Sequence, residues 1–396
     1  MSTPSPPRRL FSASISTLIV ICTSCWYMSS NSNAIASQVL FSKFGNPKDE
    51  GEARIALLAQ LLTTSQLVLG VVFSASFFCI HRFITGKKEG MLHNIRAYDL
   101  FIGVLHYIGS LCTNMGFAYG SASLVQCVKL LEPIETLILM VLAIIIRDKV
   151  LARSGGNARR EIGQILSVRK VTSTFVIIGG TMLLLTQKSM DPNPKSIVFA
   201  LISGFCMASR NVLKKTTSST GGTETKSKES RSSGEAFVLG IQSFAFITTM
   251  AAIPATCATL SCYVFRYSAL KTVISSFVEA ENEAASPLGR AIVFHCLYNV
   301  FSITVLCLTT ATTHSLLNVG KRIVNVLAAA AYFSVALSMS GKGGILLATV
   351  GAFLYNDNSI ERIRKSAVGK YFVDDQDDLS KGGIETAQST ESAATV

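Results

Sequence analysis

Ten apolar runs, separated by polar and charged segments, dominate the sequence. They cover residues 13–42, 54–80, 98–119, 121–146, 171–187, 196–213, 236–264, 288–309, 312–336 and 341–356. Most of them approach or exceed the length of about 20 residues that a helix needs to cross the hydrocarbon core of a bilayer. The pattern therefore predicts an all-α, multi-pass integral membrane protein with about ten transmembrane helices.

Composition and charge agree with this prediction. Apolar residues make up 49% of the chain and charged residues only 15%, and the mean hydropathy is +0.43, which excludes an ordinary soluble protein of this length. The net charge of +12 does not indicate a nucleic-acid partner, because the basic residues gather in every second connection between apolar runs. By the positive-inside rule, these connections and both termini are expected on the cytosolic side of a lipid bilayer.

A polar segment at 214–236, rich in Ser, Thr, Gly and charged residues, divides the chain. It predicts a flexible linker between residues 1–213, which hold the first five to six helices, and residues 237–360, which hold the others. Residues 361–396 are expected to form a polar, partly acidic tail.

Two adjacent cations, Lys321 and Arg322, lie inside the apolar segment 312–336. Each costs about 2.5–3.5 kcal/mol at the centre of a membrane helix unless it meets an anion or a polar cavity. Lys321 lies about 13 Å from Thr312, at a rise of about 1.5 Å per residue, so its side chain reaches the bilayer surface only with difficulty. This pair predicts a functional site within the membrane.

The two halves of the chain repeat one another around these cations. Lys129 has the place in the fourth run that Lys321 has in the ninth, and His106 precedes Lys129 by the same spacing as Tyr298 precedes Lys321. Five spans repeated as five spans run in opposite senses through the membrane and meet around a pseudo-two-fold axis. The fold predicted is two inverted five-helix repeats, with Lys129 facing Lys321 and Arg322.

Three positive charges in one cavity suit a dianion, and phosphate is the obvious candidate. Arg322 can offer two parallel hydrogen bonds to phosphate oxygens, and the lysines act as point charges. Polar side chains on the neighbouring predicted helices can bind the rest of a small substrate: Tyr298, Asn299, Thr113, Asn114 and Ser110.

Structural roles account for several of these residues equally well. Lys129 can pair with Glu132 as an ion pair within one helix, and Pro133 can kink that helix without any role in transport. Hydrogen bonds between helices, with no substrate involved, are an alternative for the buried amides and imidazoles: Asn114, Asn299, Asn318, His106 and His314.

Catalysis and metal binding are not expected. The chain has ten cysteines, including a CxxC at Cys22 and Cys25, but most lie in apolar runs and no partner stands at zinc-ligand spacing. No pair of nucleophile and base is apparent either. We expect neither an enzyme nor a cofactor.

Several motifs resemble the triose-phosphate translocator family of the drug/metabolite transporter superfamily. They are THSLLNVGKR ending at Arg322, YN at Tyr298 and Asn299, VKLLEP ending at Pro133, SRNVLKK ending at Lys215 and ATVGAFLYN at the end of the last run. The resemblance extends from about Trp26 to Tyr355. It implies an antiporter that exchanges phosphorylated C3, C5 or C6 compounds (triose phosphate, phosphoenolpyruvate, pentose or hexose phosphate) for inorganic phosphate by alternating access.

The resemblance also implies roles for single residues. The family residues that match Lys129, Lys321 and Arg322 hold the phosphate, and those that match Thr113 and Tyr298 help to bind the substrate. Family members with Lys and Thr in place of the KR pair are associated with nucleotide sugars, so Arg322 favours the sugar-phosphate branch.

This chain departs from the family pattern at Ser110, where plastid members usually have His, and at Leu317 and Gly320. No long Ser- and Arg-rich transit peptide is evident, which favours a Golgi, endoplasmic-reticulum or outer plastid-envelope membrane. Two other hypotheses therefore remain: an antiporter of nucleotide sugars and nucleoside monophosphates in the endomembrane system, and a membrane regulator that kept the fold without transport.

Overall fold

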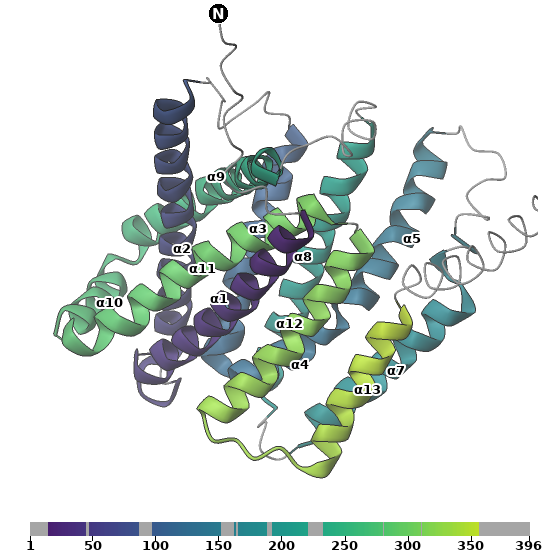
Figure 1. The fold of residues 1–396 in the computed structure, drawn as a ribbon. Helices are drawn as coiled ribbons and strands as arrows, with labels where there is room; N and C mark the ends of the chain where they lie inside the picture. The colour runs from purple at the N-terminus through teal and green to yellow at the C-terminus, as the bar shows by residue number, and fades with distance from the viewer. Residues whose placement is uncertain are drawn as a thin grey trace, which may run out of the picture.

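Every regular element that the structure describes is a helix (Figure 1). The computed structural model describes residues 15–44, 47–86, 97–151, 162–163, 165–187, 192–220, 233–279, 281–309 and 311–355. The helices are α1 (Ile15–Phe44), α2 (Pro47–Thr85), α3 (Ala97–Tyr119), α4 (Ala122–Val128), the 3-10 turn η1 (Lys129–Leu131), α5 (Glu132–Leu151), α7 (Val168–Leu185), α8 (Pro194–Thr220), α9 (Ser233–Phe265), α10 (Tyr267–Glu279), α11 (Glu281–Leu308), α12 (Ala311–Tyr332) and α13 (Met339–Tyr355).

Helix covers most of the described part of each of the ten apolar runs. Six helical segments within the described residues are long and apolar enough to cross a membrane: Gly51–Thr85, Asp99–Tyr119, Val168–Leu185, Pro194–Lys214, Phe237–Phe265 and Ala285–Leu308. The prediction of an all-helical protein with several apolar spans is therefore confirmed. The count of ten spans and their arrangement as two repeats stay predictions.

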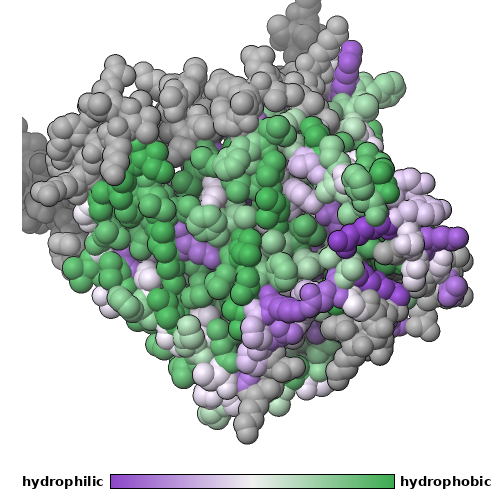
Figure 2. Space-filling view, turned by 180° about the vertical axis from the view of Figure 1, so that it is seen from behind, coloured by the Kyte–Doolittle hydropathy of each residue, from purple (hydrophilic) through white to green (hydrophobic). Residues whose placement is uncertain are grey.

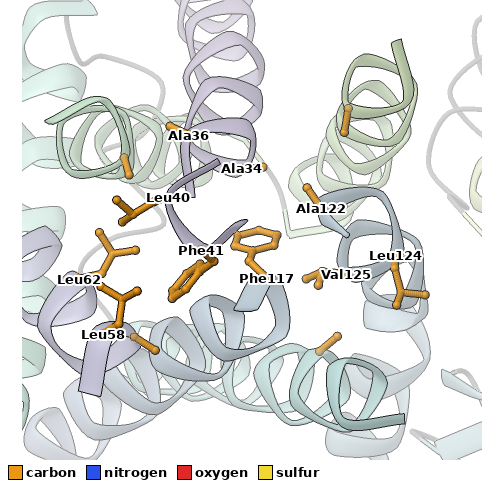
Figure 3. Packing of buried hydrophobic residues seen from close by; sticks show 14 of the residues in the cluster. Ala34, Ala36, Leu40, Phe41, Leu58, Leu62, Phe117, Ala122, Leu124 and Val125 are labelled. Atoms are coloured by element: carbon orange, nitrogen blue, oxygen red, sulfur yellow. The ribbon is translucent and has the colours of Figure 1, made fainter. Parts of the chain in front are cut away.

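Helices that are distant in sequence pack in pairs. α1 packs along α11, α3 along α8, α2 along α9, α7 along α13 and α4 against α12 (Figure 1). Between these pairs, small and branched apolar side chains form the buried core. One cluster joins α1, α2, α3 and α4 through Leu40, Leu58, Phe117 and Leu124 (Figure 3).

The outer surface carries many large apolar side chains that a soluble protein would bury. Val72, Phe175, Phe205 and Leu346 are each between 47% and 67% exposed, and hydrophobic residues cover much of one face in a broad band (Figure 2). This surface matches the hydrocarbon core of a bilayer, where exposed apolar side chains cost nothing.

One helix is broken in the middle, and the break positions the site. Ser121 caps α4 by accepting a hydrogen bond from the Leu124 amide at 3.1 Å. The chain then tightens into a 3-10 turn at Lys129, where the Lys129 carbonyl receives the Glu132 amide. The cause is Pro133, which has no N–H to give the Lys129 carbonyl its usual partner four residues on. Pro133 thus interrupts the helix, as the sequence indicated, next to Lys129.

Parts of the predicted domain organisation lie beyond the described residues. α8 continues to Thr220 and α9 begins at Ser233, so helix occupies both ends of the predicted linker 214–236. Residues 221–232 of that linker, and the tail at 361–396, fall outside the part that the structure describes.

Candidate functional site: a cationic cavity between the helices

A cavity of about 600 Å³, including its open part, lies where α1, α3, α4, α5, α8, α11 and α12 meet. Its lining is mostly polar, and five of the six residues predicted from the sequence belong to it: Lys129, Lys321, Arg322, Tyr298 and Thr113. These residues come from four elements, of which α3 and η1 lie in the first half of the chain and α11 and α12 in the second.

Lys129 reaches the cavity from the 3-10 turn. Its ammonium donates a hydrogen bond to Thr113 Oγ1 on α3 at 2.5 Å, and the residue is only 4% exposed. Thr113 itself donates to the Gly109 carbonyl at 2.8 Å and lies 2.7 Å from the Ser203 hydroxyl of α8. Thr113 therefore orients the ammonium but, as a neutral hydroxyl, does not offset its charge.

Arg322 crosses from α12 to the broken helix. Nη1 donates to Gln126 Oε1 at 2.8 Å, and Nη2 donates to Glu132 Oε2 at 2.9 Å. The sequence suggested Lys129 as a partner for Glu132, but the structure pairs this carboxylate with Arg322. Glu132 thus holds the guanidinium in place in a buried, polar setting.

The Lys321 ammonium contacts aromatic rings, whereas the neighbouring Arg322 contacts a carboxylate. Its Nζ lies 4.8 Å from the ring centroid of Trp26 on α1 and 6.0 Å from that of Tyr298 on α11. Trp26 is fully buried and stacks on His314 with ring centroids 5.0 Å apart. The ring faces stabilise the ammonium, but less strongly than an anion in the cavity would.

A fourth cation lines the cavity that was not among the predicted site residues. Arg210 of α8 is 8% exposed, and its Nη1 lies 2.8 Å from His106 Nδ1. The sequence could have indicated Arg210, because an arginine inside the apolar run 196–213 is costly without a polar partner. His106 is fully buried and does not line the cavity. Its contact with Arg210 therefore orients the guanidinium and does not reach a ligand.

Ser110 lies apart from the other predicted residues. It is 3% exposed, it does not line the cavity, and its hydroxyl has no hydrogen-bond partner among the described residues. The two asparagines proposed together with Ser110 have different positions. Asn299 lines the cavity and donates to the His295 carbonyl at 2.9 Å, whereas Asn114 donates to Thr63 and Gln66 on α2, as expected of a residue that joins helices.

Formal charges in the lining do not balance. It holds four cations, Lys129, Arg210, Lys321 and Arg322, against one carboxylate, Glu132. Uncompensated charge in a buried site is expensive, so the arrangement favours a ligand with at least two negative charges. Together with the apolar outer surface, these charges describe an integral membrane protein with a cationic cavity inside it.

Comparison with known proteins identifies its family. Residues 158–356, half of the chain, match the Triose-phosphate Transporter family. The chain belongs to this family of membrane transporters, as the sequence motifs indicated, and the matched part contains Arg210, Tyr298, Lys321 and Arg322.

One relative adds detail. The chain is 24% identical over 269 residues to the triose phosphate/phosphate translocator of non-green plastids from Brassica oleracea var. botrytis. The alignment covers 68% of this chain but 58% of that protein, less than two thirds of its length. The similarity supports a transporter related to sugar-phosphate/phosphate translocators.

Proposed function

We propose that this protein is a secondary antiporter that exchanges a small phosphorylated metabolite for inorganic phosphate by alternating access. The observation that carries the proposal is the excess of cations in the central cavity. Lys129, Lys321 and Arg322 bind the phosphate group, and Thr113 and Tyr298 contribute polar contacts to the substrate. Arg210, on α8, gives the cavity a further cation for the organic part.

Exchange follows from the same charges. Without a ligand, the cavity holds three more cations than carboxylates, and a conformational change that seals these charges away from water is costly. A bound dianion offsets most of this cost. The loaded carrier therefore changes conformation readily and the empty one does not, which makes transport in one direction depend on transport in the other.

Helix packing supports an inverted-repeat architecture with ten spans. In the predicted correspondence, α1, α2, α3, α4–α5 and α7 of one half match α8, α9, α11, α12 and α13 of the other. The contact of α1 with α11 then corresponds to that of α8 with α3. The pairs α2 with α9, α4 with α12 and α7 with α13 each map onto themselves, as a pseudo-two-fold axis requires.

For the membrane environment, we propose that both termini face the cytosol, because the basic connections lie on that side of the predicted topology. The membrane is one of the Golgi and endomembrane system or the outer envelope of a plastid. Organelle fractionation of a tagged chain, with protease protection of each terminus, tests both proposals.

Exchange is tested with purified protein in liposomes. We expect labelled phosphate to enter vesicles preloaded with phosphate, triose phosphate, phosphoenolpyruvate, or a pentose or hexose phosphate, and not vesicles preloaded with chloride. The preloaded compound that drives the fastest uptake identifies the substrate. Uptake of a nucleotide sugar against its nucleoside monophosphate, without phosphate uptake, would instead support the nucleotide-sugar function.

The single tryptophan reports ligand binding directly. Because Trp26 is the chain's sole tryptophan and lies 4.8 Å from the Lys321 ammonium, a phosphate that attracts Lys321 changes the surroundings of the indole. We expect a saturable change in tryptophan fluorescence on addition of phosphate, and none with chloride at equal ionic strength. If the protein exchanges phosphate while its fluorescence stays unchanged, phosphate does not move the Lys321 ammonium away from the Trp26 ring.

A further inference from the structure

Glu135 is a second acid, half-buried, one turn beyond Glu132 on α5. Its carboxylate lies against the backbone of Gly204 on α8, so close that a Cβ on Gly204 would lie 2.8 Å from Oε1 and 2.9 Å from the carboxyl carbon. Oε2 is buried and has no hydrogen-bond partner among the described residues. Glu135 does not line the cavity, so phosphate binding gives it no direct role.

Within the described part of the chain, the charged groups near Glu135 make their hydrogen bonds to other residues. On its own helix, Glu132 accepts from Arg322 of α12. From η1, Lys129 donates to Thr113. From α8, Cys206 faces Glu135 and brings no positive charge. Lys129 and Arg322 lie within electrostatic reach of Glu135, but neither makes an ion pair with it.

A carboxylate in this position is unfavourable when ionised. It lacks a donor at one oxygen, it shares the site with Glu132, and it lies inside a membrane helix. Taking up a proton removes the charge. Glu135 is therefore expected to carry a proton while α5 lies in the membrane.

Anion binding changes this balance in a definite direction. The negative charge of a phosphate in the cavity offsets the positive charges of Lys129, Lys321 and Arg322. These cations then stabilise the negative charges of Glu132 and Glu135 less. The surroundings of Glu135 become more negative and a proton binds to it more tightly. Because linkage is reciprocal, protonation of Glu135 strengthens anion binding by the same factor.

We propose that Glu135 is a proton-binding site and that its proton travels with the phosphorylated anion, a coupling that rests on the proposed antiport. The proton comes from water on the side to which the cavity opens and binds a carboxylate oxygen of Glu135. It returns to water on the opposite side when the anion leaves. Each half of the exchange then moves one proton and one anion together.

The pH dependence of phosphate/phosphate exchange tests the coupling. We compare wild-type protein with Glu135→Gln, Glu135→Asp and, as a matched control, Glu52→Gln, at an exposed glutamate that pairs with Lys195 on the surface. At equal pH on both sides, the phosphate concentration for half-maximal exchange should rise with pH in the wild type, by up to about tenfold per pH unit above the titration of Glu135. The titration of phosphate itself is common to all variants.

Glu135→Gln, which mimics the protonated acid, should lose this extra dependence and keep exchange at high pH, whereas Glu135→Asp and Glu52→Gln should retain it. Identical pH profiles for wild type and Glu135→Gln would overturn the proton site. Absence of exchange in the wild type at every pH would instead overturn the antiport.

An infrared measurement is independent of transport. At neutral pH, wild-type protein and Glu52→Gln should show a C=O stretch of a protonated carboxylic acid that Glu135→Gln lacks. If the wild type lacks that band both with and without phosphate, Glu135 holds no proton and the inference is wrong.

Discussion

Replacing Arg322 with alanine should reduce phosphate exchange at least about a hundredfold. The guanidinium can give two charge-assisted hydrogen bonds to a phosphate, and each contributes about 1.5–3 kcal/mol, so losing both removes at least about 3 kcal/mol of binding. Arg322→Lys should recover only part of the rate, because an ammonium keeps the charge but not the fork. Initial rates of labelled phosphate uptake into preloaded liposomes measure the effect.

Stability must be separated from binding in this variant. Arg322→Ala leaves Glu132 buried without its partner, which costs about 3–5 kcal/mol. We expect the double variant Arg322→Ala with Glu132→Gln to recover thermal stability in detergent but not exchange. Arg290→Ala, at an exposed arginine of α11, is the matched control and should leave both unchanged. Normal exchange in a folded Arg322→Ala protein would exclude Arg322 from the phosphate site.

Replacing Gly180 with valine should destabilise the fold strongly, whatever the substrate. Gly180 of α7 lies so close to α13 that a Cβ would lie 2.6 Å from the Gly344 carbonyl oxygen and 3.0 Å from the Ala348 Cα. Since both are backbone atoms, the helices can relieve the clash only by separating, which costs more than the about 1–3 kcal/mol of ordinary overpacking. We expect a lower midpoint of thermal unfolding and less monodisperse protein on size-exclusion chromatography.

The adjacent glycine provides the control. A Cβ on Gly179 would meet only Leu347 Cδ2, at an ordinary 3.6 Å. Gly179→Val therefore carries the same loss of glycine and the same branched side chain in the same turn of α7, without the clash. Equal stability of the two variants would mean that α7 and α13 do not pack as closely as described.

The phosphate-binding candidates were accessible from sequence because charge in an apolar run has few explanations. Lys321 and Arg322 violate the pattern of their segment, and Lys129 does so at the corresponding place in the other half. Arg210 violates it in the same way, but it came to notice only within a family motif and was not assigned to the site. An unbiased count of cations inside predicted spans would have found all four.

Which side chains contact one another could not be predicted from the sequence in the same way. The sequence suggested Lys129 as the partner of Glu132, and only the packing of α12 against α4 brings Arg322 to this carboxylate instead. Trp26 is separated from Lys321 by most of the chain, so no local pattern indicates that its ring faces the ammonium. Ser110 and Thr113 are three residues apart on α3, yet only Thr113 reaches the cavity.

By itself, the sequence determined which segments are helical and apolar, where Pro133 breaks a helix, and which cations need a partner. Each of these properties depends on neighbouring residues, through hydrogen bonding along one helix or the cost of placing charge in hydrocarbon. Only the tertiary structure decided that four cations and Glu132 share one cavity, and that Oε2 of Glu135 is buried near Gly204 with no hydrogen-bond partner among the described residues. Those facts depend on how distant helices pack, since packing brings together side chains that the sequence keeps far apart.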